Sequence, residues 1–169
     1  MTMLETVRYR AGQFFRGLIA AVRPDERALV AKWLSPAERA IFDGMPRRDR
    51  RHSLDVFHTL RQAGYTDPAL LEAALLHDAG KSDPRLTLAH RVAVVLLRRF
   101  APAWLERWAH DGRGWKAGFS VHMQHPERGA QMAAQAGSAA EVVELIRVHQ
   151  THPAPDERVR ILQWADGQN

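Results

Sequence analysis

The chain has 169 residues, of which 46% are hydrophobic and 25% charged, so it can form one domain with a sizeable core and is not intrinsically disordered. It contains no cysteine, which excludes disulfide frameworks, thiolate metal sites and cysteine nucleophiles. No apolar run approaches the length of about 18 residues that suggests a membrane span, and the N-terminus does not have the pattern of a signal peptide. We therefore expect a cytoplasmic protein. Its net charge of +5 predicts some attraction to phosphates, nucleic acid or an anionic surface, and a solvated basic surface is the alternative.

Apolar residues recur at helical spacing along the chain, and no sustained strand-like alternation of apolar and polar residues interrupts them. The sequence therefore predicts an all-α fold. In chain order, the expected helices cover residues 2–22, 25–33, 35–44, 50–63, 68–79, 85–100, 102–109, 126–136, 139–150 and 156–167.

The first expected helix, 2–22, carries an amphipathic stripe that includes Leu4, Phe14 and Ile19. Such a stripe most often packs on a core, and a membrane surface or the second subunit of a homodimer are the alternatives. The first 45 residues show no recognisable chemistry. We expect residues 1–45 to form a helical extension that packs on a domain formed by residues 46–169.

Capping residues mark several helix ends. Ser35 with Glu38, and Ser138 with Glu141, have the spacing of capping boxes at the starts of two expected helices. Gly80 stands where the C-cap of helix 68–79 would fall. These signals support the predicted boundaries.

Histidines and aspartates occupy positions that continue the apolar, core-facing stripes of several expected helices, usually near a helix end. A buried unpaired carboxylate is very costly, so aspartates and histidines that converge on one interior region need a common counter-charge. A divalent metal ion supplies it, and imidazole with carboxylate suits Fe, Mn, Zn, Ni or Co. Taken singly, each histidine could instead be a hydrogen-bonded core residue, and each aspartate a cap or the partner of an arginine. The residues concerned are His52, His77, Asp78, His125, His149 and Asp166.

The adjacent pair His77 and Asp78 ends an apolar run and is followed by Gly80 and Lys81. This order predicts a compact unit in which the pair binds metal and the turn brings the Lys81 ammonium toward a phosphate. A solvated lysine at the negative end of a helix dipole is the alternative for Lys81. Arg51, in the basic run before the first candidate ligand, is a candidate to bind a polyanionic substrate. A solvated first helical turn is the alternative there.

The five segments around these residues occur in the order typical of one family, and they cover roughly residues 48–167. The chain resembles the HD-domain superfamily of metal-dependent phosphohydrolases. The resemblance implies an HD-domain-like helical bundle with extra N-terminal helices and a metal site in its interior. It implies four core metal ligands, two further histidines that match a second ion, and Asp78 as the bridge. The core ligands are His52, His77, Asp78 and Asp166, and the further histidines are His125 and His149.

The resemblance also implies an activity, namely hydrolysis of a phosphoester or phosphoanhydride of a nucleotide or a related small phosphate. One or two divalent ions (Fe, Mn, Co, Ni, Zn or Mg) would activate a water molecule for this reaction. Asp78 and Lys81 would be catalytic, and Lys81 and Arg51 would contact the substrate. The alternative is a non-catalytic metal- or nucleotide-binding signalling domain on the same scaffold. Because the ligand positions are all filled, the sequence favours an enzyme.

Two departures narrow the resemblance. Some members with two metals have paired histidines where this chain has His149 and Gln150, and the Gly-Tyr-Pro motif of the cyclic-di-nucleotide phosphodiesterases is missing. The pattern is more similar to small bacterial HD proteins, including the branch that cleaves symmetrical dinucleoside tetraphosphates. Nucleic acid is not the expected partner, because no helix interleaves clustered basic residues with stacking aromatics.

Overall fold

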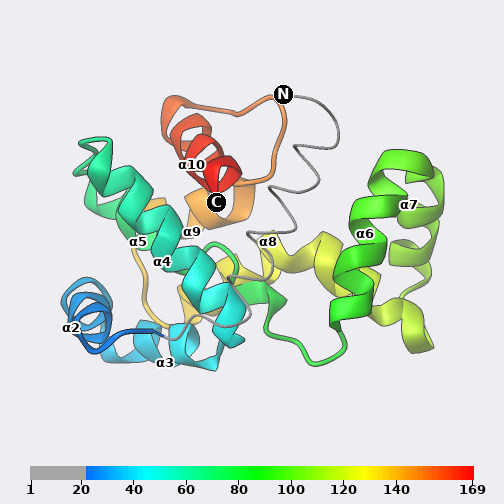
Figure 1. Ribbon diagram of the computed structural model, residues 1–169, viewed down its shortest axis with the longest axis horizontal. Helices are drawn as coiled ribbons and strands as arrows, with labels where there is room; N and C mark the ends of the chain where they lie inside the picture. The colour runs from blue at the N-terminus through cyan, green and yellow to red at the C-terminus, as the bar shows by residue number, and fades with distance from the viewer. Residues whose placement is uncertain (1–21) are drawn as a thin grey trace.

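The computed structural model describes residues 22–169, so the expected helix 2–22 lies outside the described part. Within that part all regular structure is helical, which confirms the all-α prediction (Figure 1). The elements are α2 (Pro24–Trp33), α3 (Pro36–Gly44), α4 (Arg47–Gln62), α5 (Pro68–Leu76), the 3₁₀ turn η1 (Ala79–Lys81), α6 (Leu88–Phe100), α7 (Pro102–Asp111), the 3₁₀ turn η2 (Gly114–Lys116), α8 (Ala117–Gln135), α9 (Ala140–Val148) and α10 (Glu157–Gln168).

One of the two predicted capping boxes forms. At the start of α3, Ser35 accepts a hydrogen bond from the amide of Glu38, and the Glu38 carboxylate accepts one from the amide of Ser35. The prediction for Ser138 is wrong, because α9 begins after Ala139 without a side-chain cap. The Ser138 hydroxyl instead donates to Glu38 over 2.5 Å and joins two segments that are distant in sequence.

Helix α8 begins nine residues earlier than predicted, because Pro126 lies inside the helix rather than at its first turn. Proline has no amide hydrogen, so the carbonyl four residues before it, that of His122, loses its usual helical partner. The ring of His125 donates from Nδ1 to this carbonyl over 2.5 Å. The side chain of His125 thus replaces the missing backbone donor and keeps the helix continuous.

A single large core joins α4, α5, α8, α9 and α10, and α5 is buried almost completely. Val30 and Leu34 at the end of α2, and Phe42 and Met45 at the end of α3, belong to the same core. The division between an extension and a domain at residue 45 stays a prediction. No described helix has the length and apolar character needed to cross a membrane.

Helices α6 and α7 stand beside this bundle as a pair, at the right of Figure 1. They share a small separate core with the start of α8, formed by Val94, Leu105, Ala109 and Phe119. We call residues 85–116, which contain both helices and η2, the α6–α7 lobe.

The turn η1 lies directly against α8 at Gly80. A Cβ atom at this position would lie 2.1 Å from the carbonyl oxygen of His125 and 2.8 Å from the amide nitrogen of Gly129. Gly80 is therefore not the C-cap that the sequence predicted; α5 ends at Leu76, and Gly80 lets two backbones approach closely. This contact sets the distance between Asp78, which precedes η1, and His125 on α8.

Candidate metal centre

The structure brings all six predicted metal ligands together in the interior of the bundle. They come from the first half of α4, the end of α5, the middle of α8, the end of α9 and the last turns of α10. Their ligand atoms form two groups, and within each group the atoms lie within 4.8 Å of one another. The first group is His52, His77 and Asp166, and the second is Asp78, His125 and His149.

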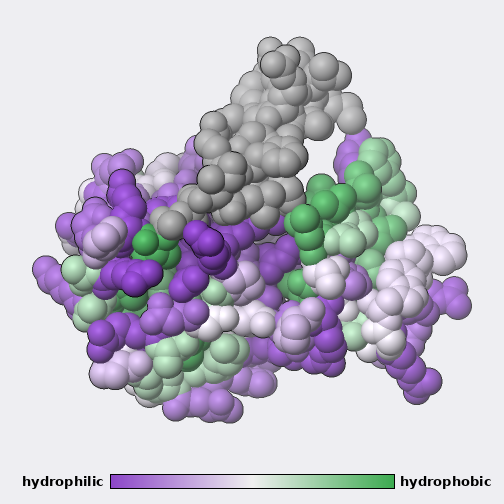
Figure 2. Space-filling model, turned by 60° about the horizontal axis from the view of Figure 1, so that its bottom comes forward, coloured by the Kyte–Doolittle hydropathy of each residue, from purple (hydrophilic) through white to green (hydrophobic). Residues whose placement is uncertain are grey.

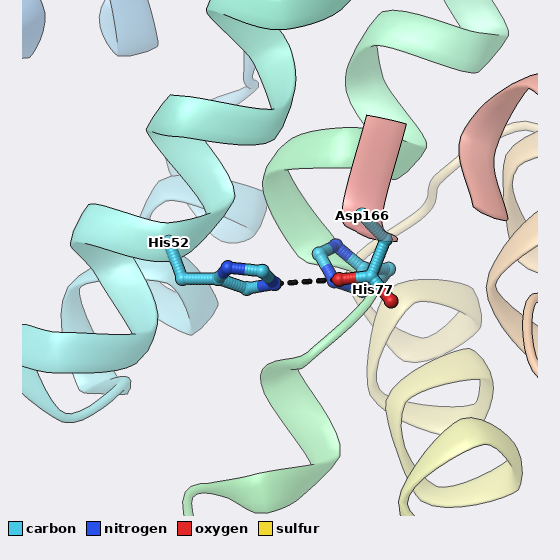
Figure 3. A group of neighbouring side chains, drawn as sticks. All are labelled: His52, His77 and Asp166. Atoms are coloured by element: carbon cyan, nitrogen blue, oxygen red, sulfur yellow. Dashed lines mark hydrogen bonds and ion pairs between the residues drawn. The ribbon is translucent and has the colours of Figure 1, made fainter. Parts of the chain in front are cut away.

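In the first group three side chains point toward one another from three separate elements (Figure 3). His52 Nε2 lies 2.7 Å from Asp166 Oδ1, and His77 Nε2 lies 3.7 Å from the same oxygen. The carboxylate of Asp166 therefore faces two imidazole nitrogens at once.

Asp78 lies between the two groups. Its Oδ1 is 3.4 Å from His125 Nε2 and 4.0 Å from His149 Nε2 in the second group. The same oxygen is 3.6 Å from His77 Nε2 in the first group, and Oδ2 is 4.0 Å from His52 Nε2. Asp78 is thus placed where one carboxylate can contact two neighbouring cation sites.

Three of the four imidazoles are oriented by backbone carbonyls. In each, Nδ1 lies within hydrogen-bond distance of the carbonyl three residues earlier; since a carbonyl only accepts, Nδ1 carries a proton, and in the neutral imidazole Nε2 keeps its lone pair. The carbonyls are available because two belong to the last turns of α5 and α9, where no further amide follows, and the third is freed by Pro126. The bonds are His77 to Ala74 (3.0 Å), His125 to His122 (2.5 Å) and His149 to Ile146 (2.7 Å).

The residues present fit a divalent ion. His77 Nε2 is buried and has no hydrogen-bond partner among the described residues, and a buried polar atom of this kind is costly unless something satisfies it. Imidazole Nε2 atoms held by outer hydrogen bonds, together with ionised carboxylates, are the donor set that first-row transition metals prefer. The geometry therefore agrees with the predicted divalent-metal site.

Both carboxylates are held in the ionised form. Burial opposes ionisation of Asp78, but the charges of Lys81 and His77 outweigh it and hold the pKa of Asp78 well below its usual range. Burial also opposes ionisation of Asp166, where the hydrogen bond from His52 and the charge of His77 lower the pKa. Both residues can therefore act as anionic ligands near neutral pH.

The histidines of the second group are neutral. Burial, with the neighbouring charge of His77, lowers the pKa of His149 to about 3, and burial with the charge of Lys81 lowers the pKa of His125. For His77, burial is outweighed by the charges of Asp78 and Asp166, which raise its pKa to about 8. Because a metal ion needs the neutral imidazole, binding at His77 would release a proton.

Lys81 lies at the edge of the centre, where its Nζ is 2.8 Å from Asp78 Oδ2. Its side chain is 14% exposed, so it is neither free in solvent nor fully enclosed. His122, one helical turn before His125, is at the same edge; burial and the charge of Lys81 lower the pKa of His122 to about 3. Of the two residues predicted to contact the substrate, Lys81 thus lies beside the ligands.

The contacts of Arg51 do not support the prediction that it binds substrate. Its guanidinium lies 2.7 Å from the buried carboxylate of Glu26 on α2 and 2.8 Å from Asp55 one turn further along α4. These two carboxylates hold the side chain in a link between α2 and α4. Arg51 is one residue before His52, so it points to a different side of the helix.

Arg48, in the same basic run, interacts electrostatically with Asp78 of the centre. Burial and the charge of Arg91 lower the pKa of Arg48, while Asp49 and Asp78 raise it. Arg91 itself lies on α6 and forms a two-pronged ion pair with Asp49, at 2.7 and 2.6 Å. The spacing from Arg48 to His52 is four residues, which places both on one face of α4 and could have identified Arg48 from sequence.

A family model of the HD domain matches residues 50–167. The chain belongs to the HD domain family. This match confirms the resemblance that the ordered His and Asp segments indicated. Searches of curated proteins and of solved structures gave no significant match. The HD domain superfamily consists generally of metal-dependent hydrolases, and some members are non-catalytic.

Proposed function

We propose that this HD domain protein is a metal-dependent phosphohydrolase that cleaves a phosphoester or phosphoanhydride of a nucleotide or a related small phosphate. The observation that carries the proposal is the position of Asp78. One ionised carboxylate lies between two groups of ligands and within 4.0 Å of Nε2 atoms from both. A purely structural cation site has no need of such a shared ligand, whereas two-ion hydrolysis depends on adjacent cations.

His52, His77, Asp78 and Asp166 would hold one ion, and His125 and His149 would hold a second ion that shares Asp78. A divalent ion bound there lowers the pKa of a coordinated water, in the limit from 15.7 to about 7, and polarises a phosphoryl oxygen. The carbonyl bonds to Nδ1 fix the imidazoles so that little reorganisation is needed when an ion binds.

Cationic side chains at the edge of the centre would receive the phosphate. Lys81 is close enough to Asp78 to reorient toward a substrate oxygen without leaving the site. Arg48 adds a second positive charge from α4, and its electrostatic interaction with Asp78 supports this role. Fixed positive groups of this kind stabilise the charge that develops on a phosphoryl group during transfer. We assign this role to Lys81 and Arg48 instead of Arg51.

The test measures metal content and hydrolysis in Asp78→Ala and His77→Ala. The assay covers nucleotides, dinucleoside polyphosphates and small phosphoesters, with Mn, Fe, Co, Ni and Mg supplied in turn. We expect both variants to lose bound metal and activity, while His110→Ala, which removes an exposed histidine on α7, keeps both. Wild-type metal content and turnover in Asp78→Ala and His77→Ala would refute the proposal.

The number of ions is tested separately with His149→Ala. This change removes one ligand of the second group and leaves the first group intact. We expect the bound metal to fall by one equivalent per chain, with the first ion retained. A wild-type chain that binds metal but turns over none of these substrates would instead support the non-catalytic role.

A further inference from the structure

The large apolar side chains that are exposed within the described part are concentrated in one place. Only Met123 and Trp164 lie elsewhere. Val95 and Phe100 are 66% and 68% exposed, more than any other large apolar residue described. All the others lie in the α6–α7 lobe, and they are Leu88, Val92, Val95, Leu96, Phe100, Trp104 and Trp115.

Helix α6 is apolar on the face that points away from the core of the lobe (the outer face), although its inner face alone packs on that core. Val94 is the residue of α6 that is buried, and it contributes to the small core of the lobe. Leu88, Val92 and Val95 follow one another at spacings of four and three residues on the opposite side of the helix. Figure 2 shows the resulting hydrophobic area over the lobe at the right. A helix that packed on one side only would be polar on this side.

The same lobe carries the whole formal net charge of the chain. Residues 85–116 contain seven Arg or Lys and two Asp or Glu, which amounts to +5, while basic and acidic residues balance in the rest of the chain. Several of the arginines are exposed and form no salt bridge with any residue that the structure describes. These are Arg98, Arg99, Arg107 and Arg113.

Three tryptophans lie in the same lobe. Trp108 contacts Trp104 and Trp115 edge to face, with ring centroids 5.7 and 5.1 Å apart, and Trp104 and Trp115 are more than half exposed. Tryptophan rings favour the boundary between water and lipid, where the apolar ring and the polar N–H are both accommodated.

We propose that the α6–α7 lobe docks on the surface of an anionic lipid bilayer, with the outer face of α6 in the headgroup region. Helices that lie in such an interface combine aliphatic and aromatic residues with Arg or Lys, and anionic lipids attract the uncompensated positive charge. Charge argues against two other occupants of this surface. A second copy of the chain would bring one lobe of charge +5 against another, and residues 1–21 are themselves positively charged, with three arginines and one glutamate.

The first experiment measures sedimentation of the full chain with vesicles of phosphatidylcholine alone or with 30% phosphatidylglycerol. We expect binding only to the anionic vesicles, and weaker binding as salt is raised. Arg99→Gln with Arg107→Gln should reduce the affinity about 25-fold, because each basic residue near such a surface contributes about fivefold. Arg158→Gln with Arg160→Gln removes the same charge from α10 and should leave binding within about twofold of wild type. Val95→Ser with Leu96→Ser, which makes part of the outer face of α6 polar, should abolish binding.

The second experiment uses the absence of cysteine from the chain. A polarity-sensitive dye on Val95→Cys should shift to shorter wavelength when anionic vesicles are added, while the same dye on Arg160→Cys should not. The proposal is overturned if the Val95 dye is already shielded without vesicles, because a second copy or residues 1–21 would then cover the face. It is also overturned if single-stranded nucleic acid produces the shift and vesicles do not. Neither readout depends on bound metal or activity, so the membrane-docking proposal can fail while the proposed function holds.

Discussion

Gly80→Ala tests whether the approach of η1 to α8 sets the geometry of the metal centre. The added Cβ would lie 2.1 Å from the carbonyl oxygen of His125, whereas an ordinary contact is at least 3.4 Å. If the strain is relieved along this line, the two backbones must separate by about 1.3 Å, the difference between these distances. Both atoms next to the Cβ belong to backbone, so no side-chain rotation relieves the contact.

The expected consequences follow from that displacement. Overpacking of this kind costs about 1–3 kcal/mol, which for a chain of this size lowers Tm by roughly 2–12 °C. The separation of 3.4 Å between Asp78 Oδ1 and His125 Nε2 would grow by far more than the tolerance of about 0.2 Å on metal–ligand distances. We therefore expect Gly80→Ala to lose the ion held by the second group before it loses its fold.

The assay combines calorimetric titration of the metal with thermal unfolding, and Gly44→Ala is the matched control. Gly44 ends α3, and no atom lies within 4 Å of the position that a Cβ would take there, so alanine should be neutral or stabilising by up to about 1 kcal/mol. Gly129→Ala, whose Cβ would lie 3.2 Å from Ile146 and 3.3 Å from Gly80, should give a smaller loss. Gly80→Ala with wild-type metal stoichiometry and affinity would refute the reasoning.

Three further predictions concern Lys81, Arg51 and Glu72. Lys81→Ala should raise KM for phosphate substrates roughly tenfold or more, because a hydrogen bond to a charged group contributes about 1.5–3 kcal/mol; unchanged steady-state kinetics would remove it from the site. Arg51→Gln should lower the free energy of unfolding by about 1–3 kcal/mol in denaturant titrations, since buried Glu26 loses a partner, and should leave KM unchanged. A raised KM with an unchanged free energy of unfolding would instead show that Arg51 binds the substrate. Burial and Glu38 raise the pKa of Glu72 to about 8, so the folded state holds this proton more tightly than the unfolded state. This contribution to stability is complete below pH 4.5 and is lost as pH rises toward 8. Glu72→Gln should flatten the dependence of Tm on pH over this range, and a pH dependence identical to wild type would contradict the raised pKa of Glu72.

Helical periodicity was sufficient to predict which polar residues lie in the interior. His149 continues the stripe of Leu145 and Ile146, and Asp166 lies one turn beyond Leu162; all of these sit on faces that the structure buries wholly or in part. A period of 3.6 residues fixes the side of the helix on which a side chain lies, whatever the tertiary arrangement. Periodicity therefore predicts that these side chains face the interior, and the likeness of the five ordered segments to the HD-domain superfamily implies that all six residues are ligands of one metal site.

Contacts between segments distant in sequence could not be anticipated in the same way. The capping motif at Ser138 is locally sound, but its hydroxyl bonds to Glu38, a residue one hundred positions earlier. Arg51 is next to a predicted ligand, yet Glu26 on α2 holds its guanidinium. In both cases a buried carboxylate from another element offered a charge-assisted hydrogen bond, which is stronger than the local alternative.

Pro126 misled the prediction of α8 and yet explains why His125 faces the centre. Proline is common at the first turn of a helix, so the helix was expected to begin there; in the structure it continues, and the carbonyl that the proline frees accepts a hydrogen bond from His125. The ends of α5 and α9 free a carbonyl for His77 and His149 in the same manner. Each of these histidines stands where the backbone lacks one amide donor, so the ring supplies that donor with Nδ1 and directs Nε2 inward. An interruption in the helical hydrogen bonding is therefore what determines which nitrogen can reach a metal ion.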